Sequence, residues 1–467
     1  MLNYTFRLKY WILPILLVLL IFFKTNTSYA CSVFCINKGK LLVTGRSYDW
    51  SFGKGFIVVN KRGQLKTALR YWEESKNNLA SWTSKYGSIT FVQYGREIAF
   101  DGMNEAGLVV SELWLDETVY PSVDSRPSVS FDQYVQYILD NFKSVDEIIK
   151  VDSLVRIRPL SKNSSKIHFF AADSSGNCIV IEFLNGKMVY HTKETMPVKA
   201  ITNNTYESSF NYINRGVPPN PNNSSSLERF YRISTMINDY KPEDGNAVAY
   251  AFKILDAVKQ GSWTKFQTAF DIKNRIVYFK SQYDWQLKYF RFDDFDFSCQ
   301  TVSKILNINT SFSGDVTQQF SDYTWQANEE MIKIAWQDYL GTTNIYQPAL
   351  QLVSRYPETF ECNGATDVKT GSVTPSGFEL KQNYPNPFNP STTIQYSLNK
   401  PSHVKLSICN LLGQEIRTLK NSFQTAGECS LVWDATDDSN NPVTSGIYFY
   451  NLQADNMNLQ KKMALVR

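Results

Sequence analysis

The pattern of hydrophobic and polar positions predicts strands and helices that come in separate blocks. After residue 31, short apolar runs rich in β-branched and aromatic residues are broken by glycine and charged turns, which is typical of strands. These runs lie at 32–36, 41–44, 56–60 and 89–93. Apolar residues then recur at offsets 0, 3, 4, 7, 8 and 11 from Phe131, and this spacing predicts a helix.

Both types of pattern return further along the chain. Strands are predicted at 167–172, 178–183, 200–202, 266–271 and 276–281, and helices from Leu227 and over 247–258. A polar segment rich in proline and asparagine, 217–226, predicts a loop. Because strands and helices are grouped and do not alternate regularly, the pattern predicts a layered α+β domain over 31–362.

The composition changes near residue 363. Residues 363–377 are rich in Gly, Ser, Thr and Pro, which predicts a linker. In 378–467, short apolar runs are separated by turns, and they lie at 392–398, 404–408, 430–433 and 447–452. This pattern over about 90 residues predicts a small β-sandwich.

Residues 1–30 have the layout of a secretory signal peptide. They contain no acidic residue, carry Arg7 and Lys9 before the apolar run 10–23, and end in Ser-Tyr-Ala. A membrane-spanning helix needs about 20 apolar residues, so this run is short for a permanent anchor. We therefore expect cleavage after Ala30, which makes Cys31 the first residue of the exported chain.

The charge balance limits the kinds of partner to expect, and the cysteine count limits the possible disulfides. The 467 residues include 48 Lys+Arg and 44 Asp+Glu, and this near balance argues against a nucleic-acid partner. Seven cysteines is an odd number, so an exported chain keeps at least one thiol unpaired. The pairing of the others cannot be read from the sequence, although Cys409 and Cys429 are candidates for a bridge within the small module.

A cysteine at a mature N-terminus combines a thiol and an α-amine in one residue. The amine has a pKa of about 7.7 to 8 and can accept the thiol proton near neutral pH, which is the strategy of N-terminal nucleophile hydrolases. With three histidines and no CxxC, HExxH or glycine-rich phosphate loop, the sequence predicts neither a metal nor a cofactor.

Four blocks carry a family resemblance. They are CSVFCINKGKLLVTGRSYDW at 31–50, DGMNEAGLVVSELWL at 101–115, AITNN at 200–204 and LERFYR at 227–232. In this order they resemble the choloylglycine hydrolases and penicillin V acylases, which are linear-amide hydrolases of the N-terminal nucleophile superfamily. The resemblance runs from Cys31 to about Ser298 and implies a four-layer αββα fold.

The resemblance implies a role for each matched residue. Cys31 is the nucleophile, Arg46 lies beside the thiolate and Asp49 orients the free amine. Asn203 matches the oxyanion-hole asparagine. Arg229 matches the first arginine of the family motif R-F-x-R, with Arg232 as the other choice of alignment.

Two tryptophans point to a branch of the family. The residue at Trp114 is expected to lend a backbone or side-chain donor to the oxyanion. Bile-salt hydrolases usually carry asparagine there, whereas Trp114 together with Trp50 resembles the penicillin V acylase and N-acyl-homoserine-lactone acylase branch. Both indoles are expected to line the substrate site. The segment 203–229 is shorter than in the bile-salt branch, which leaves a homo-oligomer open.

These features predict an exported cysteine amidohydrolase that cleaves a small-molecule N-acyl amide through a thioester. A bile-salt hydrolase is the alternative within the enzyme class, and a non-catalytic surface-binding protein is the alternative outside it. Each residue also has a structural interpretation: Cys31 could pair with Cys35, and the tryptophans could be core residues.

The C-terminal module carries a second resemblance. Its motifs are YPNPFNPSTTI at 384–394, LLGQE at 411–415, WD at 433–434, SGIY at 445–448 and KKM at 461–463. They resemble the type A sorting domain of the type IX secretion system. The resemblance implies passage through the periplasm, recognition by the secretion machinery and a secreted or surface-attached product. An immunoglobulin-like binding module is the alternative.

Overall fold

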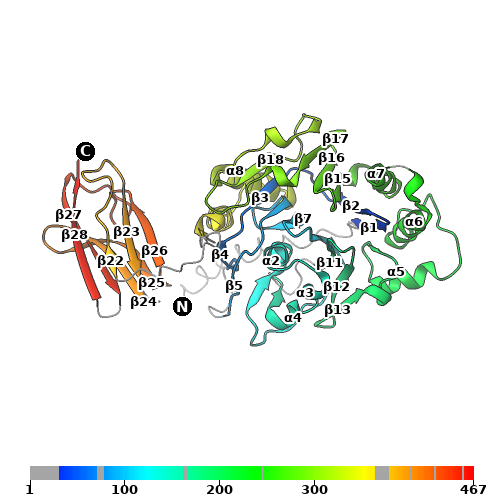
Figure 1. Ribbon diagram of the computed structural model, residues 1–467, viewed down its shortest axis with the longest axis horizontal. Helices are drawn as coiled ribbons and strands as arrows, with labels where there is room; N and C mark the ends of the chain where they lie inside the picture. Colours follow the sequence, from blue (N-terminus) through cyan, green and yellow to red (C-terminus); the bar gives the residue numbers. More distant parts are fainter. Residues whose placement is uncertain are drawn as a thin grey trace, which may run out of the picture. The chain divides into compact units, whose positions relative to one another are not determined.

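A computed structural model describes residues 31–70, 78–160, 166–244, 246–362, 378–398, 402–424, 427–454 and 457–466. The predicted signal peptide and linker lie outside these residues. The chain divides into two units, 1–365 and 366–467, and each is described by itself (Figure 1). Among the described residues, no helix is long and apolar enough to cross a membrane.

Two antiparallel sheets form the centre of the first unit. The first has the order β14 (Ala200–Ile201), β1 (Ser32–Lys38), β2 (Leu41–Asp49), β15 (Thr264–Asp271), β16 (Ile276–Ser281), β17 (Asp284–Arg291) and β19 (Gly314–Asp315), the last pair being parallel. The second has the order β13 (Lys187–Thr192), β12 (Cys178–Leu184), β11 (Ile167–Ala172), β8 (Val109–Trp114), β7 (Ala99–Asn104), β6 (Ser88–Val92), β3 (Phe56–Asn60), β18 (Lys304–Asn307) and β20 (Ser321–Asp322).

Aromatic side chains fill the space between the two sheets. The Phe266 ring of the first sheet lies 5.3 Å from that of Phe100 and 6.2 Å from that of Phe91, both of the second sheet, measured between ring centroids. All three are buried in one continuous apolar core. Burial of large rings on facing strands is the main apolar contribution that holds such layers together.

Helices cover the outer faces of both sheets (Figure 1). On the first sheet, α6 (Ser226–Asp239) packs on β1 and α7 (Ala247–Ala257) packs on β2 and β15. On the second sheet, α2 (Tyr134–Asn141) packs on β7 and β8. The predicted four-layer αββα architecture is therefore confirmed, with the predicted helix at Phe131 beginning as a 3₁₀ turn, Phe131–Gln133.

Shorter elements complete the first unit. They are β4 (Gln64–Thr67) with β5 (Ser81–Thr83) and β21 (Glu361–Cys362), β9 (Ser128–Ser130) with β10 (Arg156–Arg158), and the helices α3 (Val145–Ile148), α4 (Val151–Leu154), α5 (Tyr206–Ile213), α8 (Trp325–Leu340) and α9 (Gln347–Ser354). The sequence analysis predicted neither α8 nor α9.

The second unit is the predicted β-sandwich. One sheet contains β22 (Glu379–Leu380), β23 (Thr392–Leu398) and β26 (Gly427–Trp433), and the other contains β25 (Glu415–Gln424), β24 (Ser402–Cys409), β27 (Gly446–Ala454) and β28 (Met457–Leu465). Trp433 is fully buried between Phe388 and Tyr448. The strands β22, β25 and β28 were not predicted.

The disulfide that the structure describes is not one of the pairs that the sequence analysis considered. Cys299 and Cys362 form a disulfide, whereas Cys31, Cys35, Cys178, Cys409 and Cys429 are not joined in disulfides. The candidate disulfide between Cys409 and Cys429 is therefore not formed. Cys409 lies on β24 and Cys429 on β26, which belong to different sheets of the sandwich.

The disulfide gives a stability prediction. It joins residues 63 positions apart, and a cross-link over so long a loop restricts the unfolded chain strongly. Replacing both Cys299 and Cys362 by serine is expected to lower the free energy of unfolding of the first unit by about 2–4 kcal/mol, measured by chemical denaturation. The double variant of the free thiols Cys409 and Cys429 is the control, and equal losses in both proteins would contradict the prediction.

Candidate active site

Cys31 lies at the head of β1, next to the end of β2. The two strands are antiparallel, and their pairing begins with Ser32 opposite Ser47. The Cys31 side chain is 4% exposed, and its thiol donates to the backbone oxygen of Asp49 at 3.9 Å. Burial raises the pKa of the thiol, and the positive charge of Arg46 acts in the opposite direction.

The Arg46 guanidinium lies where two paired strands of the opposite sheet, β7 and β8, separate. The pairing of β7 with β8 ends at Asp101 and Ser111. The next two backbone oxygens, those of Phe100 and Glu112, both accept hydrogen bonds from the Arg46 guanidinium, with Nη2 2.6 Å from the Glu112 oxygen. The guanidinium is therefore held from both sides beside the thiol, and it links the two sheets.

Asp49 has one carboxylate oxygen without a hydrogen-bond partner among the described residues. Its Oδ1 accepts hydrogen bonds from the hydroxyl of Ser47, at 3.0 Å, and from that of Thr264. Its Oδ2 is buried and has no hydrogen-bond partner among the described residues. Burial raises the pKa of Asp49 to about 6, against the opposing charge of Arg229. A buried, unsatisfied acceptor of this kind is costly, so Oδ2 is a place for a donor that protein side chains do not supply.

Arg229 joins the nucleophile to the loop after β14. From α6, its Nη1 donates to the Cys31 backbone oxygen at 2.7 Å and to the Ser32 hydroxyl at 2.6 Å, and its Nη2 donates to Asn203 Oδ1 at 2.9 Å. Burial lowers its pKa to about 10, so it remains a cation at neutral pH. Arg232, the other candidate, instead binds backbone oxygens such as that of Ala257 at 2.7 Å.

Asn203 connects the site to β8. Its backbone N–H donates to the Ser226 hydroxyl at 2.8 Å, and its Nδ2 donates to the backbone oxygen of Trp114 at 2.8 Å. The Trp114 indole N–H donates to Asp116 at 2.8 Å, so the side-chain donor expected at Trp114 is directed at a carboxylate. Trp114 thus positions Asn203 through its carbonyl oxygen.

Trp50 follows Asp49 directly and is half-buried. Its indole N–H donates to the Tyr94 hydroxyl at 2.8 Å, and its ring lies parallel to that of Tyr339 on α8, with centroids 6.5 Å apart. Within the described residues, no group of three or more His, Cys, Asp or Glu side chains could hold a metal ion.

The sequence analysis missed several residues of the site. Ser47 lies two positions before Asp49 and so shares its face of β2, a signal that strand alternation carries. Thr264 contacts Asp49 only because β15 pairs with β2 in a particular register, with Thr264 opposite Asp49. No local pattern in the sequence contains that register.

Each of the two units matches a known family model. Residues 31–215 match the family model described as linear amide C–N hydrolases, choloylglycine hydrolase family, and residues 389–458 match the FlgD Ig-like domain. A penicillin V acylase of Pectobacterium atrosepticum is 29% identical over 43% of this chain and 57% of its own length. A bile salt hydrolase/transferase of Bifidobacterium longum is 27% identical over 32% of this chain and 47% of its own length.

Solved structures agree with this assignment. A penicillin V acylase from Agrobacterium tumefaciens is 26% identical, with a TM-score of 0.53 over 63% of this chain and 98% of that protein. A conjugated bile acid hydrolase from Clostridium perfringens, 17% identical with a TM-score of 0.50, shares the fold. The chain spans about half the length of the two curated relatives. Residues 31–215 therefore match the choloylglycine hydrolase family model within a unit that has the N-terminal nucleophile fold of the two solved structures, and an Ig-like domain follows.

The Asp49 carboxylate gives a prediction that depends on pH. Because burial raises its pKa from 3.8 to about 6, ionisation of Asp49 destabilises the folded chain, and this cost is absent below pH 4 and complete above pH 6. In a chain that keeps residues before Cys31, Asp49→Asn is expected to raise the free energy of unfolding at pH 7.5 by up to about 3 kcal/mol and to change it little below pH 4. Denaturation at both pH values measures this.

A chain that begins at Cys31 provides the second arm of this experiment. Its α-ammonium is expected to pair with Asp49 Oδ2, in which case the gain from Asp49→Asn should shrink or reverse at pH 7.5. Asp294→Asn, at an exposed position, is the matched control. An equal gain from Asp49→Asn in both chains would show that the amine does not pair with Asp49.

Proposed function

We propose that this chain is an exported cysteine amidohydrolase that cleaves a linear amide C–N bond through a thioester acyl-enzyme. The observation that carries the proposal is the set of contacts around one residue. The thiol of Cys31 contacts the Asp49 backbone oxygen, and Arg229 donates a hydrogen bond to the backbone oxygen of Cys31. Export with cleavage after Ala30 would add an α-amine at this same position.

The amine supplies the proton transfers. In the proposed reaction, the free amine of Cys31 takes the thiol proton as Sγ attacks the substrate carbonyl. The unpartnered Oδ2 of Asp49 accepts a hydrogen bond from the amine and fixes its orientation. The amine then gives the proton to the leaving nitrogen, the C–N bond breaks and a thioester remains. Water attacks the thioester, releases the acid and restores the thiol.

Asn203 provides the donor for the tetrahedral oxyanion. A guanidinium can only donate, so the contact of Arg229 with the Asn203 side chain fixes Oδ1 on the arginine side and Nδ2 on the other. One Nδ2 hydrogen binds the Trp114 oxygen, and the second is left for the oxyanion. A preorganised donor of this kind stabilises the negative charge that develops on the carbonyl oxygen in the transition state. Such stabilisation supplies a large part of the rate enhancement in amide hydrolysis.

The substrate is proposed to resemble that of a penicillin V acylase or an N-acyl-homoserine-lactone acylase. The Trp50 ring, which lies parallel to that of Tyr339, would suit a flat or apolar acyl group. The identity to a penicillin V acylase and the structural match to another support the first of these. A bile-salt hydrolase is the second candidate, because the bile salt hydrolase/transferase relative matches the same domain at 27% identity.

Hydrolysis by the mature protein tests the proposal. A chain that begins at Cys31 is expected to release acid from at least one of penicillin V, glycine-conjugated bile salts or long-chain acyl-homoserine lactones. Cys31→Ser should lower kcat by about a thousandfold or more, because an alcohol is a far weaker nucleophile than a thiol at neutral pH. Product release measured by liquid chromatography gives the rates, and intact mass detects the acyl-enzyme.

Two further variants make the result specific. Cys35→Ala removes a second buried thiol four residues away and should retain activity. A methionine placed before Cys31 blocks the α-amine and should abolish turnover while the thiol remains. Equal turnover by the Cys31→Ser variant would contradict the mechanism, and no turnover of any amide would favour a non-catalytic binding protein.

The second unit is proposed to be an export address of the type IX secretion system. The Ig-like match and the β-sandwich agree with a small folded module that transport machinery could bind, and the motifs at its start and end are those named in the sequence analysis. Together with the signal peptide, it would direct the hydrolase through the periplasm to the outside of the cell.

Truncation tests this address. In a bacterium with a type IX system, the full chain should appear outside the cell without residues 378–467, whereas a chain that ends at residue 365 should stay in the periplasm. Cell fractionation and intact mass of the external product measure both. Equal amounts of the two chains outside the cell would show that the module is not needed for export.

A further inference from the structure

Two buried cysteines that the proposed mechanism does not use lie in the core between the two central sheets. Cys35 is on β1, opposite Thr44 of β2, and shares with Arg46 the face that looks toward the second sheet. Cys178 begins β12 of the second sheet. Both cysteines belong to the same apolar core, and their side chains are 0% and 3% exposed.

The backbone on either side of these cysteines is tied together. Asn37, on the same face of β1 as Cys35, donates from Nδ2 to the backbone oxygen of Gly176 at 3.0 Å, two residues before Cys178. A Cβ atom at Gly176 would lie 2.1 Å from that nitrogen, so the close approach requires glycine. Lys199 adds two bonds: its backbone oxygen accepts from the Cys35 N–H at 2.8 Å, and its Nζ donates to the Gly176 oxygen at 2.9 Å.

The thiols of Cys35 and Cys178 interact with each other across the core. This interaction is the largest cause that raises the pKa of Cys178, and burial acts in the same direction. The Cys178 thiol also lies 4.0 Å from the Gly176 oxygen that Asn37 binds. Two side chains in this arrangement can be joined by a disulfide, as the two sheets of immunoglobulin sandwiches are.

The surroundings of this pair differ from those of the nucleophile. The Arg46 guanidinium favours the thiolate of Cys31, whereas the raised pKa of Cys178 keeps that thiol protonated in the folded chain. A catalytic or redox-active cysteine needs an accessible thiolate, so the pair does not suit such a role. In an exported protein, two buried thiols in contact suit a structural disulfide, formed while the chain folds and before the thiols are buried.

The position of Cys35 creates a hazard for Cys31. In the unfolded chain the two cysteines are four residues apart, and a short loop closes at a small cost in entropy. In the folded chain they lie along one strand, where four residues span about 13 Å, whereas the Cα atoms of a disulfide lie within about 7 Å. A bond between Cys31 and Cys35 would therefore be non-native and would remove the nucleophile.

We propose that Cys35 and Cys178 form a disulfide in the exported protein, and that this bond keeps Cys35 from capturing Cys31. Two S–H bonds break and one S–S bond forms, and the two protons and two electrons pass to a disulfide oxidant, which becomes two thiols. The inference rests on the export part of the proposed function. The sequence of the first unit contains five cysteines, and with the bond between Cys299 and Cys362 only Cys31 would remain a thiol there.

Disulfide mapping tests the bond. The chain 31–467 is reduced, unfolded and returned to native buffer in a mixture of reduced and oxidised glutathione, and its thiols are then alkylated in denaturant. Two disulfides would hold four of the seven cysteines, so Cys31, Cys409 and Cys429 should be alkylated. Peptide mass spectrometry should find Cys35 joined to Cys178. Alkylation of both in the folded protein would overturn the inference.

Two single variants test the protection of the nucleophile. Cys178→Ala and Cys35→Ala remove the same disulfide, but only Cys178→Ala leaves a thiol at position 35. Refolded Cys178→Ala is expected to contain at least about threefold less protein with an alkylatable Cys31 than refolded Cys35→Ala, because the short loop to Cys35 closes easily. The lost fraction should contain Cys31 joined to Cys35. Equal amounts in the two variants would overturn this protective role.

A stability measurement tests the bond independently of refolding yield. In oxidising buffer, Cys35→Ala/Cys178→Ala should have a lower urea midpoint than the unaltered chain. This difference should exceed the one in reducing buffer by about 0.5 M or more, because the bond restricts the unfolded chain only when it is formed. The loss of two buried thiols affects both buffers equally and cancels. The same difference in both buffers would overturn the inference.

These measurements are separate from the proposed hydrolysis because none of them needs turnover. If the disulfide forms and no amide is hydrolysed, only the proposed reaction fails. If the protein hydrolyses an amide while Cys35 and Cys178 remain thiols under oxidising conditions, only the disulfide fails.

Discussion

The buried guanidinium of Arg229 is the interaction on which the candidate site depends. It binds the backbone oxygen of Cys31, the hydroxyl of Ser32 and the side chain of Asn203, and so joins the head of β1 to the loop after β14. Each of these acceptors is buried or half-buried, so removal of the arginine would leave all three without this donor inside the fold. The position of α6 on the first sheet is therefore tied to the position of the nucleophile.

Strand alternation places the two charged residues of β2 that are closest in sequence to Trp50 on different faces of the strand. Arg46 and Tyr48 share the face of β2 that looks toward the second sheet, where Arg46 holds two backbone oxygens. Asp49 and Ser47 share the opposite face. Cys31 lies at the end of the neighbouring strand β1, where the charges of Arg46 and Asp49 shift the pKa of its thiol in opposite directions. Two buried charges of opposite sign are thereby kept separate.

The sequence predicted those features that local patterns carry. Strands such as Phe56–Asn60 and Ile276–Ser281 have the predicted bounds, because a buried strand is an uninterrupted or alternating apolar run. The helix α8 was missed although its ends carry signals, a capping Thr324 and a left-handed Gly341. Its buried face, which includes Met331, Ile332 and Ala335, is a narrow stripe in an otherwise polar segment. Long-range contacts were beyond reach, and the disulfide of Cys299 with Cys362 is one of them.

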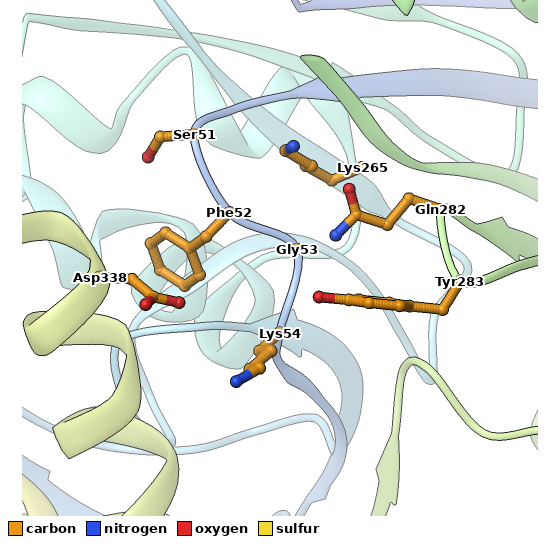
Figure 2. A pocket seen from close by; sticks show the side chains of 8 residues that line it. All are labelled: Ser51, Phe52, Gly53, Lys54, Lys265, Gln282, Tyr283 and Asp338. Atoms are coloured by element: carbon orange, nitrogen blue, oxygen red, sulfur yellow. The ribbon is translucent and has the colours of Figure 1, made fainter. Parts of the chain in front are cut away.

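The bulge on β15 lets neighbouring residues of one strand serve the candidate site and the core. In a regular ladder, Thr264 and Phe266 would lie on one face and Lys265 on the other. One extra residue instead lets Thr264 bind Asp49 while Phe266 stays in the core opposite Tyr48, and Lys265 leaves the ladder to line a cavity (Figure 2). A single backbone irregularity thus gives Asp49 Oδ1 its second hydrogen bond and keeps Phe266 in the core. Any change that straightened this strand would disturb both.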